Sequence, residues 1–477
     1  MQSIFFEKNK LSFIALVIIP ILVVIIYGQT LNFSYNIDDE YYINQLPEQN
    51  TTFFEKLASI NQPFNQSDFR PVTYTTFLIE STFFGKSAKV FHLFNLIYYS
   101  ILCFTIFLIF QFIFRTAKIE LASYIALLIA VLFLLHPSHA NVVASIKNRE
   151  SILSLSFALW ALYFWIHFLK QTKPIRLVYF FLCIGILLLS IFAKVESIVF
   201  LLILPVTGYF IVPYFFDRRK VFATLISVAV FFIVCLVLVF IIKDIPNYQL
   251  DNASIVTADE SPIDFTTSMI KRWAVTFHTF FMYEMFMIYP KGYYFYFGYD
   301  TIDLWTYKNI WPYLFGVIHL VFLIFLIALT KKRNIYALGP LIFFIAIFPF
   351  LNLFISVAGI VAVRYSFIAS LGFCMALAQL IFCLYSRLKK YNIGKPVIAI
   401  TTLSILILYG YFSRQRAQVW KDRVTLFNHD LPYLEKSVVA NRMACTYYID
   451  KYVNDKDWKN EQTLKKVIEY ADNALKV

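Results

Sequence analysis

Three consecutive acidic residues, Asp38, Asp39 and Glu40, follow the first long apolar stretch of the chain. Adjacent carboxylates repel, so ionising the second costs free energy unless the pair shares a proton or a cation. A carboxylate whose pKa is raised in this way can take a proton from an acceptor hydroxyl, a role typically worth ~10²–10⁴ in rate. We therefore predict Asp38 and Asp39 as catalytic residues, at a place that would also suit a divalent metal. The plain alternative is that they cap a helix or mark the water boundary.

Histidine and asparagine side chains suggest further polar positions. His92 and Asn95 open the second apolar stretch and lie on the same helical face. They are either site residues or polar anchors at the membrane surface. His136 and His139 flank Pro137, so a regular pair of metal ligands is not expected there, and we name no residue as a metal ligand.

Ionisable residues close to apolar stretches are the third signal. Arg149 and Glu150 open one apolar stretch, and Lys194 lies in a turn between two others. Such groups are costly near the membrane and usually face a cavity or a partner. Arginine and lysine suit phosphate, so Lys194, Arg272 and Arg364 would form an anionic head-group site if they converge. The open alternative is pairing of Arg149 or Lys194 with a nearby glutamate.

Composition predicts the fold class that must position these residues. The chain has 477 residues, of which 60% are hydrophobic and only 15% charged, against roughly 25% charged in soluble domains. Apolar stretches long enough to cross ~30 Å of hydrocarbon recur along it. We predict an all-α polytopic membrane protein with about eleven transmembrane helices. The predicted spans are 11–29, 91–114, 121–136, 150–169, 176–193, 196–216, 221–242, 311–330, 335–355, 365–386 and 396–413.

Basic residues in the short connections predict the orientation. They alternate between richer and poorer loops, which places the N-terminus in the cytoplasm and the C-terminus outside. The predicted domains are a transmembrane domain, 1–413, with outer loops 30–90 and 243–310, and an exported helical tail, 414–477. The net charge of +13 follows from these short basic clusters, and nothing indicates nucleic-acid binding.

Several short motifs occur in an order that resembles a known family. The motifs are Asp38-Asp39, Phe69-Arg70-Pro71, Phe91-His92-Leu93-Phe94-Asn95, Leu135-His136-Pro137-Ser138-His139, Asn148-Arg149-Glu150, Ala193-Lys194, Phe348-Pro349-Phe350, Val363-Arg364-Tyr365, Ser370-Leu371-Gly372 and Trp420-Lys421-Asp422. Over residues 1–430 this order resembles the transmembrane and tetratricopeptide-repeat protein O-mannosyltransferases, within the GT-C glycosyltransferase superfamily.

The resemblance implies an inverting enzyme that uses a polyprenyl-phosphate sugar, mannose-like, at the non-cytoplasmic face. The acceptor would be a protein or glycan hydroxyl, activated by Asp38 or Asp39, and membrane lipid would be a further partner. The implied substrate and donor-binding residues are Arg70, His92, Asn95, His139, Arg149, Glu150, Lys194, Arg272, Arg364 and Tyr365. A bacterial inner membrane is favoured over the endoplasmic reticulum.

The chain also departs from that family. The usual Ser-Lys-Glu is Ala193-Lys194-Val195-Glu196, and Val363 replaces the usual glutamate before Arg-Tyr. The tail has length for about one tetratricopeptide repeat, with helices expected over 437–451 and 462–476, whereas at least three repeats are normally needed for a solenoid core. The alternatives from other classes are a lipid or solute transporter without chemistry and a non-catalytic membrane scaffold.

Overall fold

The computed structural model describes residues 2–48, 51–59, 69–171, 174–212, 267–298, 301–391 and 393–475, with 229, 256, 260, 261 and 263. In this part of the chain every regular element is helical. The chain divides into two compact units. Unit 1 comprises Met1–Ser254, Leu326–Ile345 and Phe367–Lys421, and unit 2 comprises Ile255–Phe325, Ala346–Ser366 and Asp422–Val477.

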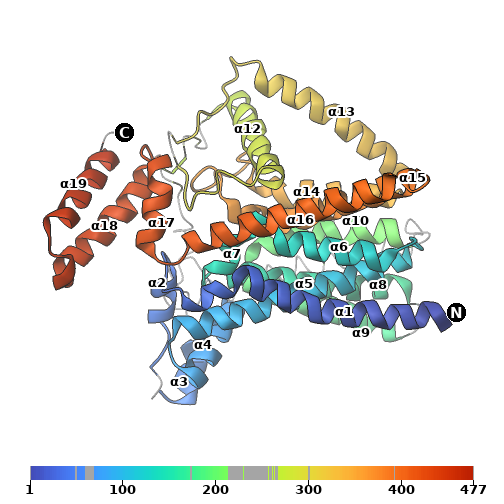
Figure 1. The fold of residues 1–477 in the computed structure, drawn as a ribbon, viewed down its shortest axis with the longest axis horizontal. Coiled ribbons are helices and arrows are strands. Elements are labelled where there is room, and N and C mark those ends of the chain that lie inside the picture. Colours follow the sequence, from blue (N-terminus) through green and yellow to red (C-terminus); the bar gives the residue numbers. More distant parts are fainter. Residues whose placement is uncertain are drawn as a thin grey trace. The chain divides into compact units, whose positions relative to one another are not determined.

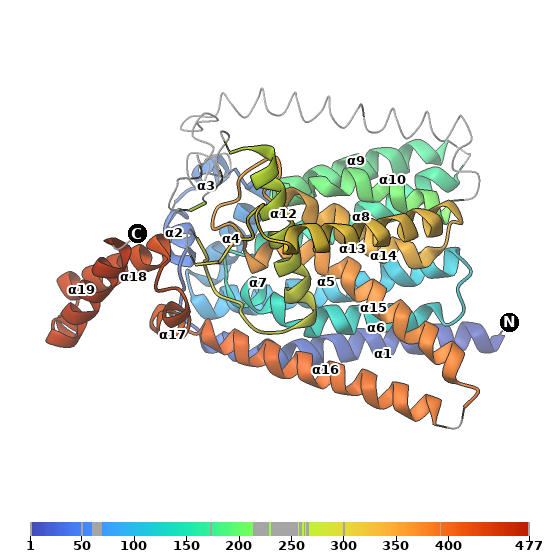
Figure 2. The ribbon, with the colours of Figure 1, turned by 90° about the horizontal axis from the view of Figure 1, so that it is seen from above.

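Unit 1 is a bundle of long apolar helices (Figures 1 and 2). Its main helices are α1 (Gln2–Tyr27), α5 (Ala88–Thr116), α6 (Ala122–Leu135), α8 (Arg149–Lys170), α9 (Ile175–Ala193), α10 (Phe200–Ile211), α14 (Leu338–Ile347), α15 (Phe367–Leu388) and α16 (Gly394–Val419). α5 packs against α1, α6 and α8, and α8 packs against α9. The shorter helices α2 (Asp39–Asn44), α3 (Phe53–Ser59), α4 (Pro71–Phe84) and α7 (Ala140–Ala144) belong to the same unit.

Seven of the described helices are long and apolar enough to cross a membrane. They lie at Lys10–Asn32, Ala88–Thr116, Arg149–Lys170, Ile175–Ala193, Trp311–Lys331, Val363–Leu388 and Gly394–Val419. An eighth span arises if Ala122–Leu135 and Pro137–Ala144, bent by 53°, count as one. The chain is therefore a multi-pass helical membrane protein.

The remaining predicted spans differ in length or lie outside the described residues. Val195–Ile211 and Ile335–Phe350 are shorter apolar helices than the predicted spans 196–216 and 335–355. The first joins the 3₁₀ turn Val195–Val199 to α10, and the predicted residues 213–216 lie outside the described part of the chain. The second joins α14 to the 3₁₀ turns Ile335–Ala337 and Phe348–Phe350. The predicted span 221–242 falls outside the described residues apart from 229. The count of about eleven stays a prediction.

A bend at Pro137 shapes the polar end of the bundle. Proline lacks the backbone N–H that would continue the α6 hydrogen-bond ladder, so α6 ends at Leu135 and a 3₁₀ turn begins at Pro137. The His136 side chain accepts the backbone N–H of Ser138 at 3.3 Å. The Leu135 carbonyl, freed at the helix end, accepts a hydrogen bond from the Ser413 hydroxyl at 2.7 Å. The break is thus compensated by side chains rather than left unsatisfied.

Unit 2 contains α12 (Met269–Ile288), most of α13 (Trp311–Lys331), α17 (Arg423–Asp430), α18 (Val438–Asn454) and α19 (Glu461–Leu475). Asp422 and Ser437 cap α17 and α18 by accepting the backbone N–H groups of Thr425 and Ala440, as short polar side chains do at helix starts. The helices expected over 437–451 and 462–476 correspond to α18 and α19. They pack against each other as a single helix pair.

Candidate functional site

The two adjacent aspartates have opposite environments. Asp39 is buried, whereas Asp38 is exposed. Asp39 Oδ2 accepts the backbone N–H of Asn36 at 3.0 Å, and Oδ1 accepts the Lys147 N–H at 2.9 Å and the Ser145 hydroxyl at 3.2 Å. Burial raises the pKa of Asp39 to about 6, although these hydrogen bonds oppose the shift. Asp39 therefore holds the backbone at Asn36 and Lys147 in place, and Asp38 is the aspartate that is open to solvent.

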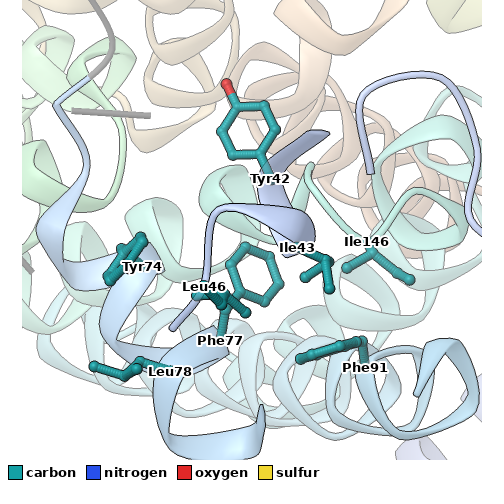
Figure 3. Packing of buried hydrophobic residues seen from close by; sticks show 8 residues of the cluster. All are labelled: Tyr42, Ile43, Leu46, Tyr74, Phe77, Leu78, Phe91 and Ile146. Carbon is teal, nitrogen blue, oxygen red and sulfur yellow. The ribbon is translucent and has the colours of Figure 1, made fainter. Parts of the chain in front are cut away.

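An apolar cluster holds this acidic segment on the bundle (Figure 3). Tyr42 and Ile43 follow Asp39 by three and four residues, so all three lie on one face of α2. The cluster contains Tyr42, Ile43, Leu46, Tyr74, Phe77, Leu78, Phe91 and Ile146. Full burial of one such side chain stabilises the fold by about 1.5–3 kcal/mol. Removing the Ile43 side chain would weaken the packing of α2, the helix that begins at Asp39.

Arg149 is fully buried at the start of α8 and is held by protein groups on several sides. Its Nε donates to Asn95 Oδ1 at 2.7 Å, Nη1 lies 2.6 Å from Glu80 Oε1, and Nη2 donates to the Phe91 carbonyl at 2.9 Å. The guanidinium also lies 4.2 Å from the centre of the Phe77 ring. Burial raises the pKa of Glu80, and the adjacent Arg149 charge opposes that shift. Arg149 thus ties α8 to α4 and α5.

A second group of charges surrounds Glu150, the next residue along. Its carboxylate pairs with Arg70, with Lys147 Nζ at 3.3 Å and with Lys194 Nζ at 3.4 Å. Lys194 also lies 3.1 Å from Glu196 and donates to the Ser151 hydroxyl at 2.7 Å. These five charged side chains, which we call the Glu150 cluster, are all at least five-sixths buried. Among the described residues, the cluster thus brings three cationic side chains to two carboxylates.

Lys147 joins the acidic segment to the Glu150 cluster. Its backbone N–H is held by Asp39 and its ammonium group by Glu150, three residues on. The Lys147 ammonium also lies 5.4 Å from the centre of the Tyr42 ring, a cation–π distance. An exposed carboxylate, Asp38, and a cationic group therefore belong to one connected structure at the end of the bundle.

The predicted polar residues of the helices are also in unit 1. His92 is buried against Phe33, with ring centres 6.1 Å apart. Asn95 Oδ1 accepts a hydrogen bond from Arg149 Nε, and Asn95 Nδ2 donates one to the Ser145 carbonyl at 3.0 Å. His139 is buried, with Nδ1 3.0 Å from the Tyr99 hydroxyl and Nε2 2.7 Å from the Ser370 hydroxyl. Both ring nitrogens of His139 are thus engaged by the protein.

Three further predicted donor residues belong to unit 2. Arg272 is buried and donates to the Leu353 carbonyl at 3.3 Å. The Arg364 guanidinium lies 5.1 Å from the centre of the Tyr365 ring, which stacks on Phe350 at 4.5 Å. Lys194 belongs to unit 1, whereas Arg272 and Arg364 belong to unit 2. The convergence of these three residues on one site therefore stays a prediction.

The same geometry bears on a divalent metal. Both oxygens of Asp39 already accept hydrogen bonds from the chain, so the Asp38–Asp39 pair offers an ion one exposed carboxylate. Within the described residues, no group of three or more His, Cys, Asp or Glu side chains gathers as metal ligands would.

Lys147, Glu80 and Glu196 are charged residues of the site that the sequence did not single out as site residues. Lys147 lies three residues before Glu150, the spacing of neighbours on a helix face, and this spacing was the available signal. Glu80 gives no such signal because its partner Arg149 is 69 residues away.

Comparison with known proteins finds no match among family models, curated proteins or solved structures.

Proposed function

We propose that this membrane protein is a glycosyltransferase that moves a mannose-like sugar from polyprenyl phosphate to an acceptor hydroxyl, on protein or glycan, at the non-cytoplasmic face. One observation carries the proposal. Lys147 links the segment that bears Asp38 to the Glu150 cluster through its backbone N–H and its ammonium group. The order of motifs that resembles the O-mannosyltransferases supports the same activity. We place the enzyme in a bacterial inner membrane.

The proposed reaction uses Asp38 as the base. The Asp38 carboxylate takes the proton of the acceptor hydroxyl as its oxygen bonds to the anomeric carbon. The bond from that carbon to the phosphate oxygen breaks at the same time, and polyprenyl phosphate leaves. Attack from the opposite side of the ring inverts the anomeric centre.

The Glu150 cluster is the proposed binding site of the donor phosphate. Arg70, Lys147 and Lys194 bring three cationic side chains to one place, around the Glu150 carboxylate. A phosphate arriving beside them would accept hydrogen bonds from these cations in place of the glutamates. Charge-assisted hydrogen bonds of this kind are about twice as strong as neutral ones. Arg149 and Glu80, both buried, then act as positioning residues that hold α8 in place.

The deciding experiment is sugar transfer in membranes supplied with labelled mannosyl polyprenyl phosphate and an acceptor peptide. We expect Asp38→Asn to lower the rate by about 10²–10⁴ while the protein remains folded. Glu48→Gln is the matched control, because it removes another exposed carboxylate of the same loop. Asp39→Asn should lower both transfer and thermal stability, since it loosens the turn that carries Asp38.

Other results would count against the proposal. An Asp38→Asn variant as active as wild type would remove Asp38 from the chemistry. Movement of the labelled lipid across the membrane without sugar transfer would favour the transporter alternative. Retained fold with neither transfer nor lipid movement would favour a scaffold.

A further inference from the structure

A groove of about 660 Å³ lies between α6, α15 and α16 in unit 1. Its walls are mostly apolar and include Leu128, Val131, Phe382 and Leu406. The three helices lie against one another (Figure 2), and α15 and α16 are long enough to span the membrane. The volume is in the range of about 300–1,000 Å³ that is typical of small-molecule sites. An apolar groove along membrane-spanning helices suits an acyl chain.

The polar mouth of the groove carries positive charge. Lys395, in the first turn of α16, lines the groove together with Tyr124 and Tyr385. Arg387, Lys389 and Lys390 precede it in sequence and are exposed. The exposed Glu120 is the acidic residue just before α6. Basic residues at the cytoplasmic ends of helices attract anionic lipid head groups, and tyrosines favour the level of the head groups.

We infer that this groove binds an anionic glycerophospholipid, with an acyl chain between α6 and α16 and the phosphate at Lys395. Charge complementarity selects this lipid class, because a zwitterionic lipid carries its own ammonium beside the phosphate. The predicted orientation places this end of the bundle at the cytoplasmic leaflet.

The site is separate from the proposed sugar-donor site. Lys395 lies at the start of α16. Just past the end of that helix, the Trp420 carbonyl accepts a hydrogen bond from the side-chain amide of Asn36, whose backbone N–H donates to Asp39. At a rise of 1.5 Å per residue, the 25 steps from Lys395 to Trp420 span about 38 Å. The inference therefore stands or falls independently of the glycosyltransferase proposal.

Native mass spectrometry of the delipidated full-length protein in detergent tests the inference. The probes are phosphatidylglycerol and phosphatidylcholine with the same acyl chains. We expect wild type to retain one phosphatidylglycerol in preference to phosphatidylcholine. Lys395→Gln should lower its occupancy about tenfold, as expected for loss of a charge-assisted hydrogen bond, and Lys395→Arg should restore it.

Matched variants separate the groove from general effects of charge and bulk. Thr402 lines the groove and its neighbour Thr401 does not. We therefore expect Thr402→Phe to displace the lipid and Thr401→Phe to leave it bound. Lys332→Gln removes an exposed lysine outside the groove and should also leave it bound.

Equal retention of the two lipids by wild type would overturn the inference, as would unchanged retention in both Lys395→Gln and Thr402→Phe. The melting temperature provides a second readout that does not depend on the variants folding equally well. Phosphatidylglycerol should raise the melting temperature of wild type more than phosphatidylcholine does. Absence of that difference would equally overturn the inference.

Discussion

Arg149 Nη1 and Glu80 Oε1 lie 2.6 Å apart, with 0% and 1% of the two side chains exposed. The pair joins the start of α8 to α4, and Thr76 and Asn95 complete the shell of the guanidinium. A buried charge that loses its partner is costly, whereas loss of both partners is much less so. The pair should therefore behave as one energetic unit.

Removing either partner of this pair should destabilise the protein strongly. We expect Arg149→Met or Glu80→Gln alone to lower the free energy of unfolding by about 3–5 kcal/mol. The double variant should lose clearly less than the two single losses added together. Denaturant unfolding in detergent measures this, with Lys89→Gln as the control because Lys89 is exposed at the start of α5. Strict additivity would show that the two charges are not coupled.

Lys194 should affect donor binding. Its ammonium group contacts Glu150, Glu196 and Ser151, and in the proposed reaction it also faces the donor phosphate. Loss of one charge-assisted hydrogen bond of about 1.5–3 kcal/mol should raise the KM for the polyprenyl-phosphate sugar at least tenfold in Lys194→Gln. Lys89→Gln should leave KM unchanged. A fall in kcat without any change in KM would contradict this role.

Stability should depend on pH through Asp39. Its pKa rises from 3.8 to about 6 on folding because of burial, so between these values the folded protein binds the proton more tightly. The contribution is present below pH 3.8 and is lost as the pH rises through 6, a change of about 3 kcal/mol. Melting temperatures of wild type and Asp39→Asn from pH 4 to 7 test this. The advantage of wild type over the variant should shrink with pH, and a constant difference would refute the shift.

Two glycines should respond oppositely to alanine. A Cβ on Gly372 of α15 would lie 2.4 Å from the Phe343 backbone nitrogen of α14, as in close helix crossings that need small residues. Gly372→Ala should therefore lower the melting temperature. Gly185 of α9 has nothing within 4 Å of its Cβ position, so Gly185→Ala should be neutral or stabilising by up to about 1 kcal/mol. Equal effects would mean that the α14–α15 crossing is not as close as described.

Much of the secondary structure could be predicted from the sequence, because apolar length and local charge are properties of neighbouring residues. The stretches at 91–114, 150–169 and 176–193 correspond closely to α5, α8 and α9. The predicted span 121–136 also ends next to Pro137, as α6 does, and the two helices expected in the tail correspond to α18 and α19. The number of spans could not be decided in this way, because a stretch of about 16 apolar residues fits a span or a shorter buried helix equally well.

The candidate site shows what only the tertiary structure decides. The sequence identified Asp38, Asp39, Arg149, Glu150 and Lys194 by residue type and position. It did not show which of Asp38 and Asp39 is buried. Consecutive helical residues point about 100° apart, so the two side chains face different surroundings, which the local sequence does not specify. The buried residue of the two is determined by Ser145 and Lys147, more than 100 residues away. Likewise, Glu80 becomes the partner of Arg149 only when α4 packs beside α8. The sequence by itself thus determined which ionisable groups are present and where they lie along the chain. The partner and the exposure of each charge are decided by long-range packing.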